Sequence, residues 1–135
     1  MNEELLQYYE HPGILAQIAW SYLNRSSYAA ARHWYQRMLD AAERADESEA
    51  ARALHGLATV DLRQGDYETA REKFQKTLEI RQQIGDRAGE ASTLHQLASI
   101  DVNQGDYVTA REKFQTALKI KQQIGDRAGE AYTLH

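Results

Sequence analysis

Apolar residues recur along the chain at steps of three and four, which is the spacing of one face of an α-helix. One stripe consists of Ala91, Leu94, Leu97 and Ala98, and the next consists of Tyr107, Ala110, Phe114, Ala117 or Leu118, and Ile124. No segment shows the strict alternation of apolar and polar residues that is typical of a half-buried strand. The pattern therefore predicts an all-α protein.

Gly-Asp pairs separate these helical stripes. Gly105-Asp106 lies between the two stripes described above, and Gly85-Asp86 and Gly125-Asp126 repeat the same device. Glycine can adopt the left-handed conformation that ends a helix, and aspartate can cap the start of the next helix. Asp46 followed by Glu49 is a capping-box pattern. We therefore expect antiparallel helical hairpins closed by tight turns.

The hairpin repeats with a period of 40 residues, since 27 of 35 positions are identical between residues 61–95 and 101–135. A more divergent copy lies upstream. Self-similarity at this period is typical of a stack of supersecondary units. The predicted division is a lead (1–11), three full units (12–45, 46–85 and 86–125) and the truncated first helix of a fourth unit (126–135).

This organisation predicts seven helices, two from each of the three units and a seventh that begins at about Ala128. The lead is expected to add a short helix at Glu3 to Tyr9. Alanines at equivalent positions of paired helices let the hairpins pack closely. The predicted core comprises Tyr67, Phe74, Leu78, Leu94, Leu97, Phe114 and Leu118.

The residues of the third unit resemble a known family. They are similar to the W-x2-L-G-x2-Y…A-x3-F pattern of the tetratricopeptide repeat (TPR). The matching run is Leu94-x2-Leu97-Ala98…Gly105-Asp106-Tyr107…Ala110-x3-Phe114-x2-Ala117-Leu118. The resemblance covers roughly residues 12–135. It implies an α-solenoid of antiparallel helix hairpins, the TPR superhelix, that acts as a protein-binding scaffold.

The chain departs from the TPR pattern in three features. The period is 40 residues rather than 34, as in the long-repeat subgroup of kinesin light chains and bacterial signalling arrays. Gly-Asp replaces the proline that closes the shorter repeat. Asp61 and Asp101 occupy the position of the family's first-helix tyrosine, whereas Tyr22 keeps that tyrosine in the first unit.

Composition excludes several classes of protein. The chain is 42% apolar and 27% charged, which is ordinary for a globular protein. Without cysteine it has no disulfide or thiolate metal site, which fits the cytoplasmic location that we expect. No apolar run is long enough to span a membrane, and the acidic N-terminus does not resemble a secretory signal. The net charge of −4 argues against a nucleic-acid partner.

No catalytic or cofactor-binding motif is present, so we do not expect an enzyme. His55, His95 and His135 recur exactly one period apart and form a row along successive first helices. Equivalent positions on packed helices lie about 8–10 Å apart, whereas zinc ligands must approach one ion to about 2 Å. These histidines are therefore interpreted as polar groove residues or inherited copies, with metal binding as the alternative.

Asp61 and Asp101 lie on the apolar side of the first helices. A lone buried carboxylate costs several kcal/mol, so we expect each to meet an arginine or a tyrosine hydroxyl at the seam between units. A ligand-binding role is the alternative.

In the TPR family the first helices line a concave face on which peptides lie. The resemblance transfers that role to Trp20, Asn24, Arg52, His55, Thr59, Arg63, Ser92, His95, Ser99, Asn103, Tyr132 and His135. None of these is acidic and two are arginines, which favours an acidic or carboxylate-ended peptide. Trp20 is either an anchor for the ligand or is covered by Tyr8 and Tyr9. Protonation of the five histidines is expected to strengthen such binding as the pH falls through about 6.5.

The sequence thus predicts a protein-protein interaction module, a fragment of a larger TPR array. The alternative is a structural segment, for self-association or spacing, in a bacterial signalling or regulatory protein. Because 126–135 has no second helix to cover it, an apolar face around Leu118 and Leu134 is expected to remain exposed. We expect self-association through this end, as a two-fold pair of ends, by exchange of the half helix or by head-to-tail stacking. The two-fold pair is favoured because it is closed.

Overall fold

The computed structural model describes residues 12–42 and 46–133, with side chains described for 13–42 and 46–125. These residues form six helices and no strand, which confirms the all-α fold class. The helices are α2 (Pro12–Asn24), α3 (Tyr28–Ala42), α4 (Glu47–Arg63), α5 (Tyr67–Ile84), α6 (Arg87–Asn103) and α7 (Tyr107–Thr133).

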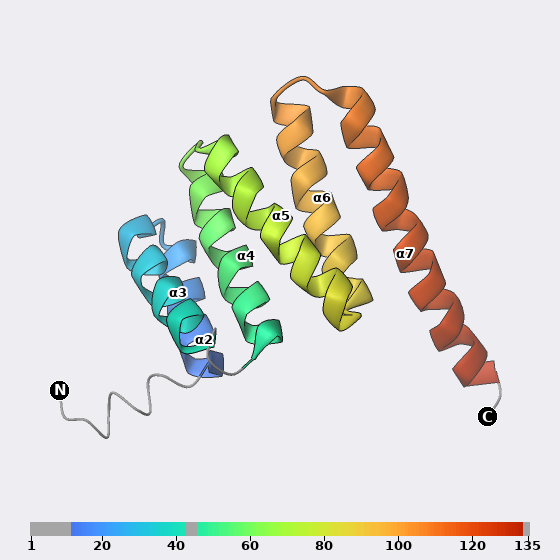
Figure 1. The fold of residues 1–135 in the computed structure, drawn as a ribbon, viewed down its shortest axis with the longest axis horizontal. Coiled ribbons are helices and arrows are strands. Elements are labelled where there is room, and N and C mark those ends of the chain that lie inside the picture. The colour runs from blue at the N-terminus through green and yellow to red at the C-terminus, as the bar shows by residue number, and fades with distance from the viewer. Residues whose placement is uncertain (1–11, 43–45, 134–135) are drawn as a thin grey trace.

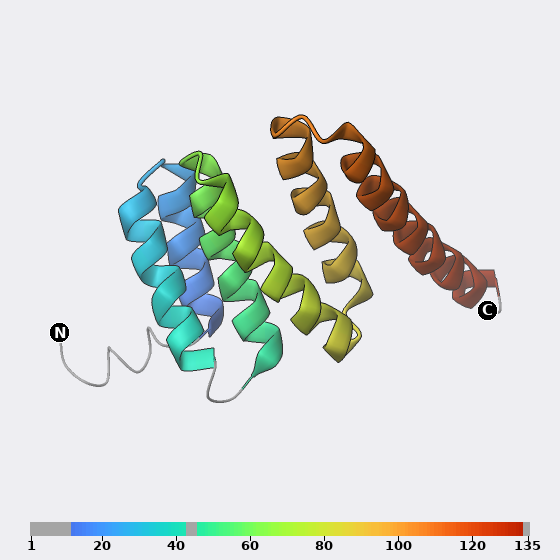
Figure 2. The ribbon, with the colours of Figure 1, turned by 45° about the horizontal axis from the view of Figure 1, so that its top comes forward.

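The helices follow one another in a single row from one end of the molecule to the other (Figure 1). Each packs against its neighbours in the sequence, and α2 also contacts α4. Figure 2 shows α2 to α5 as a closely packed group, with α6 and α7 extending the row. Contacts between successive hairpins, and not closure around one centre, therefore build the fold, as expected for an α-solenoid.

The turns between helices use the predicted Gly-Asp device. Gly65, Gly85 and Gly105 have φ angles of 80°, 75° and 81°, in the left-handed region that favours glycine. Each is followed by an aspartate whose carboxylate accepts a hydrogen bond from a backbone N–H three residues later. These caps are Asp66, Asp86 and Asp106.

The turn predicted at Gly125-Asp126 is not formed. Helix α7 runs from Tyr107 to Thr133 without interruption, so the separate seventh helix expected from about Ala128 is part of it. Continuing α7 through these residues keeps their backbone N–H and C=O groups hydrogen-bonded. The short helix expected at Glu3 to Tyr9 lies outside the described residues.

The capping box predicted at the start of α4 is only half formed. The Asp46 carboxylate accepts a hydrogen bond from the backbone N–H of Ser48 at 2.9 Å, as an N-cap should. The Asp46 N–H, however, donates to the carbonyl of Ala42 at 2.8 Å, so it is not available to Glu49. The Glu49 carboxylate instead lies 3.8 Å from Arg52.

Two apolar clusters form the core, one around α2, α3 and α4 and the other from α4 to α7. Phe74, Leu78, Leu94 and Leu97 are buried as predicted. Tyr67 and Phe114 are only half-buried. The prediction that Leu118 lies in the core is wrong: it is 56% exposed, because none of the other described helices packs on the outer side of α7. The alanines predicted to let paired helices approach are buried: Ala19, Ala31, Ala58, Ala70, Ala98 and Ala110.

Candidate functional site

An open cavity of about 370 Å³ lies where α2, α4 and α6 converge. These are the first helices of the three hairpins, the elements expected to line the concave face. The structure brings five of the predicted groove residues to this cavity: Trp20, Arg52, His55, Thr59 and Arg63. The sequence did not single out Ala16, Leu23, Tyr35, Gly56 and Gln96, which also line it.

Tyr35 reaches the cavity from a second helix, α3, because Gly56 leaves room for its ring. A Cβ atom at Gly56 would overlap the Tyr35 side chain. Gly56 lies inside α4, where glycine is unfavourable for the helix by about 1 kcal/mol relative to alanine. An isolated glycine within a helical pattern often has such a packing reason, so this residue was the available sequence signal for the contact.

The charge around the Tyr35 hydroxyl is positive. Burial raises the pKa of Tyr35, and the positive charges of Arg52 and Arg63 oppose that increase. None of the residues that the structure places along this cavity is acidic. The Glu49 carboxylate, one turn before Arg52, is 3.8 Å from its guanidinium and offsets part of its charge.

Arg63 and Arg52 are held differently. Nη1 of Arg63 donates a hydrogen bond to the carbonyl oxygen of Leu23 at 3.2 Å, so Arg63 also satisfies a backbone acceptor at the end of α2. The Arg52 side chain is 53% exposed. Both arginines are exposed, and Arg63 has a structural role in addition to its place in the cavity.

Trp20 forms an apolar wall at the edge of the cavity. Its side chain is 52% exposed, which is unusual for a tryptophan and leaves its ring accessible. The alternative cover, by Tyr8 and Tyr9, lies outside the described residues. A large, accessible aromatic ring beside cations is a common anchor in interfaces.

His55 is an uncharged member of the cavity wall. Its Nδ1 lies 3.2 Å from Nη1 of Arg81, and because a guanidinium only donates, this Nδ1 accepts and the imidazole proton is on Nε2. The ring also packs edge-on against Phe74, with centroids 5.2 Å apart. Burial, together with the positive charge of Arg81, lowers the pKa of His55 to about 4.

This value corrects one expectation from the sequence. His55 was expected to gain a proton as the pH falls through about 6.5 and to add positive charge to the groove. With a pKa of about 4 it stays neutral over that range. The cavity owes its positive charge to arginines and does not depend on the protonation of this histidine.

Arg81 lies behind His55 and connects three helices. Nη1 donates to Thr93 Oγ1 at 2.8 Å and to the carbonyl oxygen of Gly89 at 3.3 Å, both on α6. Nε lies 3.8 Å from a carboxylate oxygen of Asp86. Burial lowers the pKa of Arg81, and the Asp86 carboxylate opposes that change.

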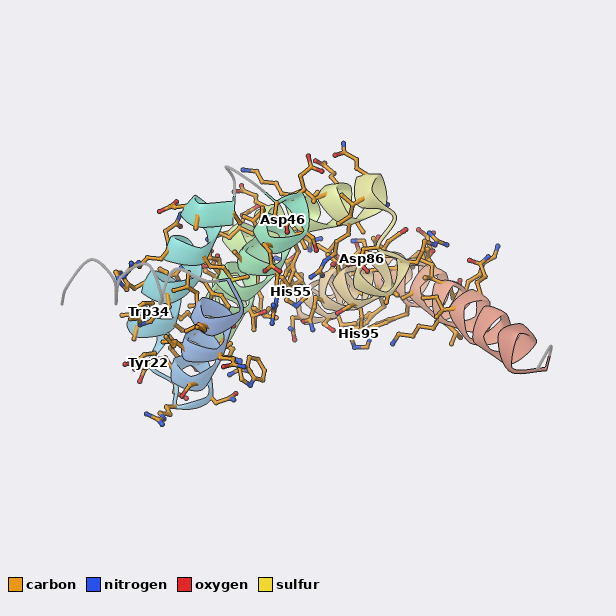
Figure 3. All side chains as sticks on the ribbon, turned by 90° about the horizontal axis from the view of Figure 1, so that it is seen from below. Tyr22, Trp34, Asp46, His55, Asp86 and His95 are labelled. Atoms are coloured by element: carbon orange, nitrogen blue, oxygen red, sulfur yellow. The ribbon has the colours of Figure 1, made fainter. Side chains whose placement is uncertain are left out.

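The remaining predicted groove residues lie apart from this cavity. Asn24 is exposed at the end of α2, and Ser92, His95 and Asn103 are exposed on α6, with Ser99 half-buried. Figure 3 shows His55 on α4 and His95 on α6, at successive positions along the stack. The Tyr132 side chain and His135 lie outside the described side chains.

The two repeated histidines share one packing arrangement. His95 packs edge-on against Phe114 with centroids 5.1 Å apart, as His55 does against Phe74. In the part of the chain that the structure describes, no three potential metal ligands come together. These two histidines therefore take part in the same His-Phe contact in the second and third hairpins.

Asp61 and Asp101 lie at the seams between units, and their predicted arginine partners are confirmed. Asp61 pairs with Arg32 at 2.7 Å, and Asp101 pairs with Arg71 at 2.7 Å. A lysine from the same unit, which the sequence did not predict, contacts the second oxygen of each carboxylate. Lys73 lies 2.5 Å from Asp61 Oδ2, and Lys113 lies 2.6 Å from Asp101 Oδ2.

No helix in the described ranges combines the length and the apolar character needed to cross a membrane. No curated protein sequence matches the chain. Solved structures match its fold. The TPR domain of Arabidopsis FLU superposes with a TM-score of 0.74 at 20% identity, covering 81% of this chain and 92% of that one. BtubC (BKLC) from P. vanneervenii gives a TM-score of 0.76 at 20% identity, covering 84% of this chain and 48% of that one.

A family model described as tetratricopeptide repeat matches residues 13–83 and 49–123. These two overlapping matches cover most of the chain and include α3 to α6 in full and most of α2 and α7. The match agrees with the helical hairpins, with the Gly-Asp turns and with the likeness to the TPR domain of FLU. The chain belongs to the tetratricopeptide repeat family.

Proposed function

We propose that the protein is an interaction module that binds a peptide or partner domain on its concave face, with the cavity between α2, α4 and α6 as its principal site. The TPR family is a family of protein-binding scaffolds and not of enzymes, and no catalytic activity is proposed. The specific ligand that we propose carries an acidic side chain or a C-terminal carboxylate, and it requires no cofactor.

The observation that carries this proposal is the convergence of Arg52, Arg63 and Tyr35 beside Trp20. The two guanidinium groups and the hydroxyl can donate hydrogen bonds to a carboxylate. The Trp20 ring and the side chains of Ala16 and Leu23 offer apolar surface for an adjoining side chain. A carboxylate next to an apolar side chain therefore fits both halves of the cavity.

Binding of labelled peptides, measured by fluorescence anisotropy, tests the proposal. An acidic peptide should bind more tightly than its basic counterpart, and its affinity should fall as salt is added. Arg52→Ala should weaken it about two- to fivefold, the range for one partly exposed ion pair. Arg25→Ala is the matched control, because Arg25 is exposed and lies outside the cavity lining.

Arg63→Ala needs a second measurement, because it also removes the hydrogen bond to Leu23. Its affinity should be compared with its thermal unfolding midpoint, so that lost binding is separated from lost folding. A peptide array without any preference for acidic over basic sequences would contradict the proposed specificity and leave only the general assignment to a binding scaffold.

The other expectations from the sequence stay predictions. The lack of cysteine remains the reason to expect a cytoplasmic location. Self-association or a spacer role remains the alternative function, and the exposed apolar side chains of α7, such as Leu118 and Val108, are the feature that it would use. Sedimentation at high micromolar concentration measures self-association directly.

A further inference from the structure

An arginine recurs at the same place in the second helix of each hairpin: Arg32 in α3, Arg71 in α5 and Arg111 in α7. Arg32 and Arg71 each donate to the aspartate of the following first helix, with N–O distances of 2.7 Å in both seams. Arg111 is exposed, and it has no hydrogen-bond or ion-pair partner among the described residues.

The two complete seams also share a second acceptor. Nη2 of Arg32 donates to Oε1 of Gln64 at 2.6 Å, and Nη2 of Arg71 donates to Oε1 of Gln104 at 2.6 Å. Each glutamine follows its aspartate by three residues, at the end of the helix. The arginine of one unit is thus bound by an Asp-x-x-Gln segment that ends the first helix of the next unit.

The surface around Arg111 has the form of an unfilled seam. It is an open cavity of about 380 Å³, lined mainly by Tyr107, Ala110, Arg111, Phe114, Gln115 and Leu118 of α7. One repeat earlier, α6 covers the same positions of α5: Leu78 is 7% exposed, whereas Leu118 is 56% exposed. Phe74 is completely buried, whereas Phe114 is only half-buried. Figure 2 shows no other helix on the outer side of α7.

We propose that this face of α7 is a docking surface for a further helical hairpin of the same repeat type, whose first helix ends in Asp-x-x-Gln. The aspartate and glutamine of that hairpin bind Arg111, and its apolar side chains cover Phe114 and Leu118. The hairpin supplies its own lysine to the second carboxylate oxygen, as Lys73 and Lys113 do within their units.

A second copy of this chain does not offer the same chemistry. In α2 the positions equivalent to Asp61 and Gln64 hold Tyr22 and Arg25. Head-to-tail stacking would therefore bring Arg25 towards Arg111 and provide no carboxylate. A two-fold pair of ends would place the α7 face against itself, and no described residue lining that face is acidic. Either mode would cover the apolar surface but leave the guanidinium unpaired.

The experiment extends the chain by a copy of residues 96–125 placed after His135. Residues 126–135 repeat 86–95 with one change, Tyr132 for Ser92, so the extension creates a complete fourth hairpin with its own Asp-x-x-Gln segment. Urea unfolding is measured for Arg111→Gln, for aspartate-to-asparagine in the added hairpin, and for both changes together. These variants form a double-mutant cycle. The matched reference is a second double-mutant cycle, with Arg71→Gln and Asp101→Asn.

The expected result is strong coupling: the double variant loses little more stability than either single variant, as in the reference cycle. Amide exchange around Leu118 should also slow by about tenfold or more when the hairpin is added. Additive losses, with the added hairpin shown to be helical by circular dichroism, would overturn the proposal. A dimer through α7 that persists after the hairpin is added would assign this face to a second copy instead, and would overturn it as well.

Discussion

Arg32 donates a hydrogen bond to Asp61 across the seam between the first and second hairpins, with Nη1 2.7 Å from Oδ1. The carboxylate is on α4, and its two cations come from the helices on either side: Arg32 from α3 and Lys73 from α5. One buried acid thus joins three helices, and the same arrangement recurs around Asp101. This contact orients neighbouring units in addition to contributing to stability.

Asp61→Asn should lower the free energy of unfolding by about 1–3 kcal/mol, because two partly buried cations lose their shared counter-ion. Asp101→Asn should have a similar effect at the second seam. Urea unfolding followed by circular dichroism measures both. Asp40→Asn is the control: Asp40 is exposed on α3 and should change stability by less than about 0.5 kcal/mol.

Two glycine substitutions should have opposite effects. Gly56→Ala places a Cβ against the Tyr35 ring and should destabilise by about 1–3 kcal/mol, as overpacking does. Gly125→Ala should stabilise by about 0.5–1 kcal/mol, because Gly125 lies inside α7 with open space around it. Thermal unfolding compares the two variants. Destabilisation by Gly125→Ala would show instead that Gly125 forms the left-handed turn predicted from the sequence.

His55 should make stability depend on pH below neutrality. Its pKa is about 4 in the folded protein and about 6.5 when unfolded. The unfolded chain therefore binds the proton more readily, and the stabilisation present above pH 6.5 is lost as the pH falls towards 4. The slope for this residue is about 1.4 kcal/mol per pH unit.

Removing the imidazole tests this assignment. His55→Gln should flatten the decrease in stability between pH 6.5 and 4, measured by urea unfolding at a series of pH values. His95→Gln is the matched control, because the residue equivalent to Arg81 is there the exposed Lys121. An unchanged acid profile in His55→Gln would argue against a neutral, buried His55.

The equivalent phenylalanines should differ in their contributions. Phe74 is fully buried, so Phe74→Ala should cost about 3–5 kcal/mol. Phe114 was placed in the same predicted core, but it is only half-buried, so Phe114→Ala should cost clearly less. Hydrogen exchange should place the damage from Phe114→Ala in α6 and α7, since solenoid units contact only their neighbours. Equal loss of protection in α2 and α3 would contradict this.

The sequence predicted the features that depend on local periodicity. Helix spacing, the Gly-Asp turns at Gly85 and Gly105, and the family all follow from patterns within one 40-residue unit. The arginine partners of Asp61 and Asp101 were predicted from the cost of burying a lone carboxylate. In these cases the local pattern and the packing favour the same structure.

The features that the sequence did not predict depend on what lies next to a unit. The exposure of Leu118 arises because no other helix in the described part of the chain covers the outer side of α7, which continues past Gly125. The approach of Tyr35 to Gly56 joins residues of two units and has no counterpart in the repeat pattern. The low pKa of His55 follows from its burial and, second, from the positive charge of Arg81, which reaches it from another helix. A repeat pattern describes one unit well but contains little information about a particular pair of units.

The opening beside Tyr35 has a consequence for how such an array can grow. At the next seam Phe74 occupies the place of Tyr35 and Gln96 that of Gly56, so the hydroxyl and the space that admits it are both missing. Units copied from the second or third hairpin would lengthen the molecule and extend its reach. They would not add another opening of this kind, so the valency of the array for such a ligand would stay the same while its span increases.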